Sequence, residues 1–471
     1  MSKIIFSLVF LLLGCGCYLS SSYSHLRNRE AFQEQFSINN QAAAFPADKI
    51  LNLSDIQKIV LQNNLDYRSM IYAVQAAKRR YYQFFNGYLP QIDINSGVAQ
   101  ELEKSYDVTH PPANIYPERN GLNVGVSMQA SYLIFDGLER EIAILLAKND
   151  YRVSLKNAEN LQRILLRASA YIYYDAILAQ AEMEIAQADL DFQLSSLAQA
   201  EERYKYGFVS QAAVLNFKIL ANQARSNLLN ALYRYECAAF ALINLMGYDD
   251  GELKNLKLQF ISENKLKNSE LKILSLATYL DLAVVNRVDL QQSLLILQNA
   301  ELRKKETYAA FMPQIYLKAD LGFTHEYSKL KHHDFNKYKY DEWGFSYGIY
   351  GKWNIFRGFA DYNKLREAES YERYYLLQLG RKYLDIVTEV QIAYANYRNA
   401  CVQVELYRQS CQWVKEQRDL VQAEYWGGQD TITRLNGAQS AVVESESKLA
   451  IALINSYKAL AQLEAAINLP L

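Results

Sequence analysis

Residues 87–94 read GYLPQIDI and residues 310–317 read AFMPQIYL. Each stretch follows a run with helical periodicity and opens a segment in which apolar and polar residues alternate. Because the residue before a proline is pushed out of helical geometry, each helix should end just before Pro90 or Pro313. We predict that these prolines mark helix–strand junctions, and that the chain makes the same switch twice, 223 residues apart.

Two further stretches recur with nearly the same offset. YLIFDGLER around Ile134 returns as WNIFRGFAD around Ile355, and RYKYGFVSQAAVL at 203–215 returns more loosely as EYWGGQDTITRLN at 424–436. Three landmarks in the same order, at offsets of 221 to 223 residues, indicate an internal duplication. Each half would then contain a helix, two strands, a very long helix, a glycine turn and a return helix.

The boundaries of the predicted elements follow from this repeat. The spans 118–312 and 314–469 contain no proline, which favours long helices. We expect a first repeat at 51–246, a linker at 247–275 and a second repeat at 276–469. The expected strands cover residues 91–102, 121–135, 314–325 and 343–356.

The alternation predicts a sheet with one apolar and one polar face. A sheet with one wet face is its commoner cause, but small and charged polar faces also suit a water-filled lumen. Trp343 and Trp353 lie on the apolar face ten residues apart, which is about 25 Å in height for a strand tilted by about 40° and matches the aromatic girdles of an outer-membrane barrel. Four strands cannot close a barrel, because about eight are needed, so the barrel would be shared between chains.

The N-terminus predicts export. The stretch MSKIIFSLVFLLLGCGC has one lysine and then a ten-residue run, Ile4 to Leu13, that is apolar except for Ser7; this run is too short to span a bilayer and typical of a signal peptide. Its LLGC is similar to a bacterial lipobox, which predicts a signal peptide at 1–14, a lipid on Cys15 and an anchor segment at 15–50. The alternative is an ordinary cleaved signal that ends near Ser24.

The composition and the motifs exclude several classes of function. Fifty Lys and Arg balance 51 Asp and Glu without a basic cluster, so nucleic acid is not an expected partner. No HExxH, phosphate-loop or Gly-x-Ser-x-Gly motif occurs, so we expect neither an enzyme nor a cofactor. The sequence HHD at 332–334 could bind a metal, but a solvated outer loop is the expected role and no metal site is predicted.

The repeated order of elements, with LPQ or MPQ entering strands and IFDG or IFRG leaving them, resembles the TolC family of outer-membrane factors. The resemblance covers about residues 50–469. It implies an α+β membrane protein: a long α-helical coiled-coil tunnel in the periplasm, and four strands per chain in a shared 12-stranded trimeric outer-membrane β-barrel. It also implies a homotrimer in outer-membrane lipid, a periplasmic adaptor (membrane fusion protein) and an inner-membrane transporter of the RND, ABC or MFS class. The linker 247–275 would form an equatorial belt.

The family's YxxGxxS turns lie at the periplasmic tips, where the tunnel meets the adaptor. A glycine permits the left-handed turn that reverses the chain, and Ser or Thr caps the returning helix. The tip and docking residues that the resemblance assigns, with their neighbours, are Tyr204, Gly207, Phe208, Val209, Ser210, Tyr425, Gly427, Gly428, Asp430 and Thr431.

One departure from the family concerns the tunnel aperture. The family has aspartates six and nine residues after the second tip glycine, whereas Arg434 and Gly437 stand there in this chain. The equivalents after the first tip glycine are Ala213 and Asn216. Three Arg434 side chains on one axis would repel each other and favour anions, unless Asp430 neutralises them. Arg434, Asn216 and Asp430 are therefore the candidates for the constriction.

The resulting functional hypothesis is a passive outer-membrane conduit for small-molecule efflux in a tripartite export system. The alternative within the family is the exit duct of a type I protein secretion system. From a different class, a lipid-anchored coiled-coil scaffold without a pore would share the long helices. The sequence does not indicate which substrate is carried.

Overall fold

The computed structural model describes residues 50–103, 119–248, 257–258, 274–330 and 337–469. Cys15 and the rest of the segment before Ile50 lie outside these ranges, as do most of the linker 247–275 and the histidine-containing loop at 332–334. None of the described helices has both the length and the apolar content needed to cross a bilayer.

The chain divides into two compact units. The described residues within Met1–Arg68, Leu165–Glu270 and Cys401–Lys458 form the first, which we term the tip unit. Those within Ser69–Ile164, Leu271–Ala400 and Ala459–Leu471 form the second, which we term the sheet unit. The two longest helices, α5 (Glu139–Lys205) and α10 (Ala360–Trp426), each contribute to both.

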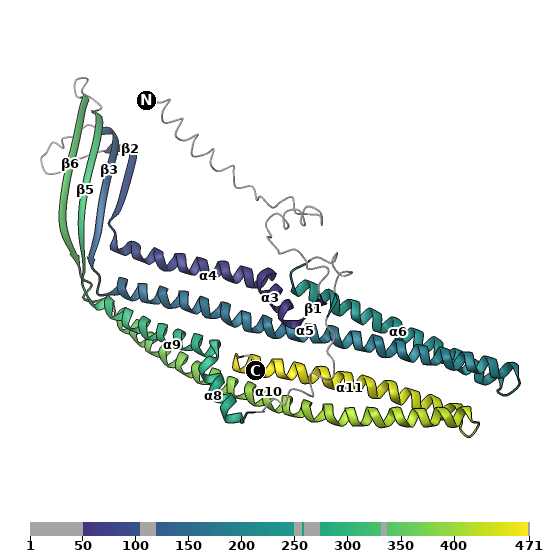
Figure 1. Ribbon diagram of the computed structural model, residues 1–471. Helices are drawn as coiled ribbons and strands as arrows, with labels where there is room; N and C mark the ends of the chain where they lie inside the picture. The colour runs from purple at the N-terminus through teal and green to yellow at the C-terminus, as the bar shows by residue number, and fades with distance from the viewer. Residues whose placement is uncertain (1–49, 104–118, 249–256, 259–273, 331–336, 470–471) are drawn as a thin grey trace. The chain divides into compact units, whose positions relative to one another are not determined.

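The sheet unit contains four antiparallel strands in the order β2-β3-β5-β6 (Figure 1). Their bounds are Gln91–Glu103 for β2, Arg119–Phe135 for β3, Gln314–Leu330 for β5 and Lys337–Lys352 for β6. Residues that face each other across the ladders alternate between apolar pairs, such as Met128 and Leu321, and polar pairs, such as Gln129 and Asp320. Each strand therefore has one apolar and one polar face.

The fourth strand differs from its prediction at both ends. It begins six residues earlier than position 343, because Lys337, Lys339 and Asp341 pair with β5 although they interrupt the apolar alternation. It ends at Lys352 instead of 356, because its partner β5 begins only at Gln314. Pro313 has no N–H to extend the ladder, so the chain from Trp353 onward passes beyond its partner strand.

The same order of elements occurs in both halves of the chain. The first half contains α3 (Leu53–Asn63), α4 (Leu65–Gln83), η2 (Phe84–Tyr88), β2, β3, α5 and α6 (Gln211–Leu245). The second half contains α8 (Leu276–Asn286), α9 (Val288–Thr307), η4 (Tyr308–Phe311), β5, β6, α10 and α11 (Ile432–Ile467). Outside this repeat, β1 (Ile50–Leu51) pairs in parallel with β4 (Lys257–Leu258).

Both strand-entry prolines follow a short 3₁₀ helix. Leu89, after η2, has φ −111° and ψ 147°, and Met312, after η4, has φ −101° and ψ 153°. Both values are extended, as expected for a residue before proline. Pro90 and Pro313 thus lie between the helical and the strand backbone in each half.

In each half, a carbonyl oxygen at the end of the return helix accepts a hydrogen bond from a side chain. That side chain belongs to the residue that separates two earlier helices. In the tip unit, Asn64 donates from Nδ2 to the carbonyl oxygen of Leu245 at 3.1 Å. In the sheet unit, Arg287 donates from Nη1 to the carbonyl oxygen of Ala466, also at 3.1 Å. These positions correspond at offsets of 223 and 221 residues, so the duplicated fold keeps the contact while its chemistry changes from a neutral amide to a guanidinium.

Candidate functional site: the two hairpin tips

Two helical hairpins, α5–α6 and α10–α11, reverse direction at glycines in the tip unit (Figure 1). Gly207 and Gly428 have φ values of +78° and +79°, in the left-handed region that glycine adopts without strain. The Phe208 N–H bonds to the carbonyl of Arg203, and the Gln429 N–H bonds to that of Glu424, both at 2.9 Å. Each long helix therefore ends in the same C-terminal cap.

The two return helices begin at hydroxyl residues. Ser210 accepts a hydrogen bond from the Ala213 N–H at 3.3 Å, and Thr431 accepts one from the Arg434 N–H at 3.4 Å. Both bonds span three residues, as in an N-cap. The second cap is reinforced because the Asp430 carboxylate accepts from the Thr431 N–H at 2.7 Å.

An apolar cluster joins the two hairpins just behind the turns. All four helices contribute buried residues to it, and Phe217 and Leu435 are completely buried. Tyr425 packs against this cluster, whereas its counterpart Tyr204 is exposed. Burial raises the pKa of Tyr425, although the positive charge of Arg203 opposes that effect. The two motif tyrosines are therefore not equivalent.

Arg203 and Trp426 connect the two turns directly. The Arg203 guanidinium donates from Nη1 to the Trp426 carbonyl oxygen at 3.0 Å and lies 4.7 Å from the centre of its ring. The ring of Phe217 also stacks on that of Trp426, with the ring centres 6.4 Å apart and an interplanar angle of 16°. No sequence signal predicted this pair, although each residue is the immediate neighbour of a motif tyrosine.

The outward surfaces of the turns differ in character. Tyr206 and Phe208 on the first turn are 73% and 78% exposed, and Val209 between them and the cap is half-buried. The second turn instead carries Gln429 and Asp430. The first turn therefore exposes aromatic side chains, whereas the second carries polar side chains beside Gly427 and Gly428.

The aperture candidates are tied to local partners. Arg434 pairs with Asp430 at 3.1 Å, and this ion pair joins a 62% exposed guanidinium to a carboxylate that is only 8% exposed. Asn216 accepts a hydrogen bond from Asn436 at 3.0 Å, which connects α6 to α11. The charge of Arg434 is thus balanced within its own chain, so an excess positive charge at the tips does not follow from this residue alone.

A polar layer lies on the other side of the apolar cluster. Gln439, nearly fully buried, donates from Nε2 to the Asp189 carboxylate at 2.8 Å and accepts from Arg418 Nη1 at 3.0 Å. The Arg418 guanidinium also lies over the ring of Phe192, 5.3 Å from its centre. Buried polar groups that find partners in this way specify one arrangement of the helices. Sequence periodicity could not show this layer, because its members come from three separate helices.

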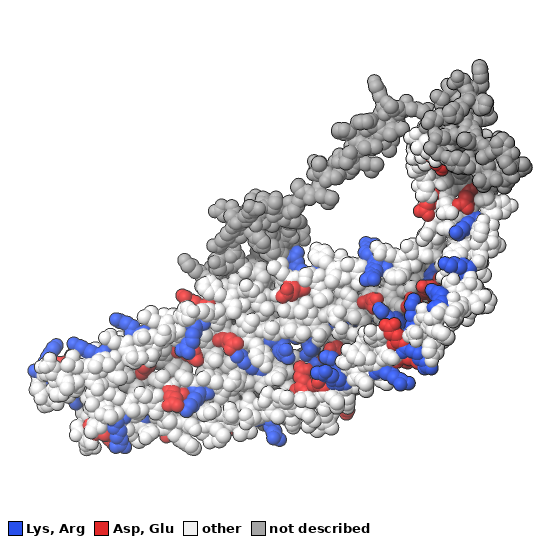
Figure 2. Space-filling view, turned by 180° about the vertical axis from the view of Figure 1, so that it is seen from behind, with Lys and Arg blue, Asp and Glu red and all other residues white. Residues whose placement is uncertain are grey.

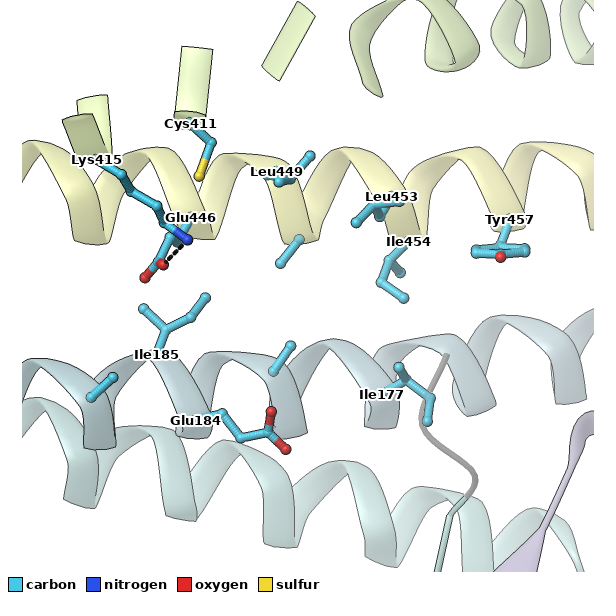
Figure 3. Close-up of a pocket in the computed structure, with 13 residues that line it drawn as sticks. Ile177, Glu184, Ile185, Cys411, Lys415, Glu446, Leu449, Leu453, Ile454 and Tyr457 are labelled. Carbon is cyan, nitrogen blue, oxygen red and sulfur yellow. Dashed lines mark ion pairs between the residues drawn. The ribbon is translucent and has the colours of Figure 1, made fainter. Parts of the chain in front are cut away.

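An apolar groove runs between α5, α10 and α11 in the tip unit and has a volume of about 340 Å³. Figure 3 shows Ile177 and Ile185 on one side, and Leu449, Leu453 and Ile454 on the other. Lys415 and Glu446 form an ion pair of 2.6 Å at one end. Most of the lining is aliphatic, and such an apolar surface suits packing.

The remaining surface of the described chain offers no other chemical centre. Among the described residues, no three His, Cys, Asp or Glu side chains lie close enough to hold a metal ion. On the face drawn in Figure 2, lysines and arginines are interspersed with acidic residues along the helices, without a large area of one sign. In the sheet unit, Trp343 is exposed on β6, and Trp353 lies one residue past its end and donates to the Phe311 carbonyl oxygen at 3.1 Å.

Comparison with known families identifies the chain. The sequence model of the outer membrane efflux protein family matches residues 57–248 and 279–469, which is most of the chain and both of its halves. The chain belongs to the outer membrane efflux protein family. As a member of this family it is an outer-membrane efflux channel and not an enzyme.

Solved structures of channel proteins share the fold of this efflux protein. CusC, described for conformational changes accompanying folding and transmembrane channel formation, is 18% identical with a TM-score of 0.72, covering 90% of this chain and 94% of CusC. The Campylobacter jejuni CmeC outer membrane channel is 14% identical with a TM-score of 0.73, covering 92% and 87%. The open state of the Neisseria gonorrhoeae MtrE outer membrane channel is 17% identical with a TM-score of 0.66, covering 91% and 96%. No curated protein sequence is detectably similar to the chain.

Proposed function

We propose that three copies of this chain form one outer-membrane conduit. The observation that carries this proposal is the sheet: β2 and β6 each lack a strand on their outer side among the described residues, and the apolar face is exposed along both. A sheet with open edges is not stable in lipid, because each unpaired backbone group there costs several kcal/mol. Pairing between copies removes the edges.

The space needed inside the barrel favours three copies over two. Two copies would give about eight strands, a barrel whose interior side chains fill. Three copies would give twelve strands and leave room for water between polar faces that carry residues such as Gln129, Asp320, Lys318 and Ser131. A trimer also agrees with the family resemblance.

The helices of the tip unit carry matching evidence for contact between copies. On α6 and on α10, large apolar side chains recur at spacings of four, seven or ten residues and remain exposed in the single chain. The exposed residues are Leu215, Ile219, Leu229 and Tyr233 on α6, and Val402, Leu406, Trp413 and Leu420 on α10. Such heptad-like seams are covered in coiled coils, and a second copy would cover them here.

The hairpin tips are the proposed docking ends for a periplasmic adaptor, which would join the conduit to an inner-membrane transporter of the RND, ABC or MFS class. The exposed aromatic pair Tyr206 and Phe208 and the polar second turn support this role, since tips without partners would not need a solvent-exposed aromatic pair. The conduit is passive, and small molecules are its proposed cargo. The division into repeats 51–246 and 276–469, the equatorial linker 247–275 and the tryptophan girdle of Trp343 and Trp353 remain part of this proposal.

Planar-bilayer recording tests the conduit. Purified protein should insert as discrete single channels, whereas a lipid-anchored scaffold without a pore would give none. A matched pair of variants tests the aperture: Arg434→Ala should shift ion selectivity toward cations, and Asp430→Asn should shift it toward anions, because each removes one member of the same ion pair. Strong cation preference that neither variant alters would place the constriction elsewhere.

We also propose that residues 1–14 are a signal peptide and that Cys15 anchors the mature chain through lipid. Metabolic labelling with palmitate should mark the wild-type protein and not the Cys15→Ala variant. An ordinary signal cleaved near Ser24 predicts an unlabelled wild-type protein whose mature mass does not change in the variant.

A further inference from the structure

The two strand-to-helix turns each hold a bulky apolar residue in a left-handed backbone. Leu138, between β3 and α5, has φ +70°, and Phe359, between β6 and α10, has φ +64°. These positions are equivalent in the two halves, 221 residues apart. A bulky side chain with positive φ is a genuine outlier, because its Cβ is crowded by the backbone. Such strain persists only where the surroundings enforce it, so it points to a role for both turns.

The side chains of both turns are sorted in the opposite way from a water-exposed surface. Asp136 and Asp361 are only 4% and 8% exposed, whereas Leu138 and Phe359 are 57% and 68% exposed. The ring of Phe356, also exposed, lies edge-on to that of Phe359 with the ring centres 5.5 Å apart. Water favours apolar groups inside and charged groups outside. These turns therefore suit an apolar environment.

The buried charges of the turns are satisfied within the chain. The Asp136 carboxylate accepts a hydrogen bond from the Arg140 N–H at 3.0 Å, at the start of α5. In the second half the charges are exchanged, since Arg357 and Asp361 stand at these two positions and Arg357 donates from Nε to the Asp361 carboxylate at 2.9 Å. Both turns thus keep a polar interior and an apolar exterior, although the polarity of the pair is reversed.

The exposure of Leu138 is not explained by a missing copy of the chain. The segments on either side of its turn belong to the same chain and are in place. Arg140 donates from Nη1 to the Gly87 carbonyl oxygen in η2 at 2.8 Å. At Gly137, an added Cβ would lie 2.8 Å from Met312 Cβ, just after η4. Leu138 remains exposed with both of these neighbours present.

Both turns follow directly on the apolar face of the sheet. Ile134, on that face of β3, and Ile355, three residues past β6, precede the two turns and are themselves exposed. The opposite face carries polar residues such as Gln129 and Ser131, which suit the water-filled lumen of the proposed conduit. In an outer-membrane sheet the apolar face meets lipid, and its rim meets the boundary between acyl chains and headgroups.

We propose that Leu138 and Phe359 insert into the inner leaflet of the outer membrane and anchor the two turns among the phospholipid acyl chains. This step rests on the proposed conduit, because it takes the apolar face of the sheet to be the lipid face. Transfer of the two side chains from water to lipid offsets the strain of the left-handed backbone. Glycine or asparagine would fit that backbone better but would not insert.

Fluorescence quenching in lipid vesicles tests where the turns lie. The full-length protein is reconstituted in vesicles of phosphatidylethanolamine and phosphatidylglycerol, with Cys15 kept for its proposed lipid. The cysteines replaced by alanine are Cys17, Cys237, Cys401 and Cys411. A small fluorophore is attached to Leu138→Cys, to Phe359→Cys or, outside the strained backbone, to Ile355→Cys. The unsubstituted cysteine-depleted protein gives the background labelling.

Two neighbouring residues of β2 provide matched controls. Ile94→Cys carries the label on the apolar face, and Asn95→Cys carries it on the polar face. A nitroxide near the headgroup end of the lipid acyl chain reports lipid contact, and iodide reports water contact. Side chains inserted about 5–10 Å into the headgroup and acyl boundary should give Leu138→Cys and Phe359→Cys a ratio of lipid to iodide quenching at least about threefold above that of Asn95→Cys.

Asparagine variants separate insertion from a role limited to the turn. Asparagine tolerates a left-handed backbone, as at Asn468 with φ +57°. The double variant Leu138→Asn/Phe359→Asn should therefore still fold, but the lipid-to-iodide ratio of a label at Ile355→Cys should fall at least about twofold, because the anchors are lost. Each asparagine substitution is also made singly, so that one variant remains if the double variant does not assemble.

Iodide quenching that exceeds lipid quenching at both turns overturns the proposal, because the turns then lie in water. Protection from both quenchers also overturns it, since protein, either a second copy or another segment of this chain, then covers them. An unchanged label at Ile355→Cys in the asparagine variants shows that Leu138 and Phe359 are not the anchors. Absence of channels in the unsubstituted protein is a separate result, which overturns the conduit itself.

Discussion

Replacing Arg287 with methionine should lower the stability of the fold by about 3 kcal/mol, the lower end of the range for breaking a buried ion pair. The Arg287 side chain is only 3% exposed and makes two hydrogen bonds of 2.7 and 2.8 Å to the Asp289 carboxylate. It also lies 2.8 Å from Glu389 and donates to the Ala466 carbonyl oxygen at the end of α11. Methionine fills similar space but leaves the Asp289 carboxylate buried without these partners. We expect the lower end because Lys382 remains 4.0 Å from Asp289.

The double variant Arg287→Met/Asp289→Leu is the matched control. Removing both charges avoids an uncompensated buried carboxylate, and such replacements are often nearly neutral. The double variant should therefore recover much of the stability lost by Arg287→Met, as measured by denaturant midpoints of detergent-solubilised protein followed by circular dichroism. Equal losses in the single and double variants would show that the contact with the α11 carbonyl, and not the ion pair, stabilises this region.

The stability that the Arg287–Asp289 ion pair contributes should fall as the pH is lowered. Burial by itself would raise the pKa of Asp289, but the hydrogen bonds and charge of Arg287, with Arg163 and Lys382, outweigh it and hold that pKa below its usual value. The unfolded chain then binds the proton more readily than the folded one. The stabilisation is fully present above the ordinary aspartate pKa of about 3.9 and is lost as the pH falls through the lower folded value. Wild type and Asp289→Asn should therefore converge only in acid.

Local sequence signals account for most of the fold. Pro90 and Pro313 place the strand entries, strict alternation gives the two faces of each strand, and proline-free spans give the long helices. These signals act between residues close in sequence. The ends of β6 were predicted wrongly because strand length depends on the partner, and β5 starts after Pro313 and continues past the region of clean alternation.

At the tips, the sequence predicts the turns but not the contacts between the two hairpins. The reversal at Gly207 and Gly428 follows from the motif, since a left-handed backbone favours glycine. The contact between Arg203 and Trp426 joins residues 223 positions apart, and no periodicity within one helix reports it. The sequence also placed Arg434 near Asp430 without fixing their contact, and the 3.1 Å ion pair shows that the two charges are matched in one chain.

Replacing Gly137 with alanine is the second change that we expect to be severe, with a loss of about 2–5 kcal/mol. Two effects add here: a left-handed backbone costs a non-glycine residue about 1–2 kcal/mol, and forcing a methyl group into a packed site costs about 1–3 kcal/mol. The site is packed because the added Cβ would meet Met312 Cβ at 2.8 Å and the backbone of Ala309 at 3.0 and 3.1 Å. Backbone atoms at these positions cannot rotate away.

Gly207→Ala separates the two effects, because Gly207 has nearly the same φ, +78° against +74°, and no atom within 4 Å of the added Cβ. It should lose only the backbone contribution, about 1–2 kcal/mol. Denaturant unfolding of both variants beside wild type measures the difference. Equal losses would mean that the loop after β3 can shift away from η4 at little cost. A larger loss at Gly137 would show that the close packing of this loop against Met312 and Ala309 adds to the cost of the left-handed backbone.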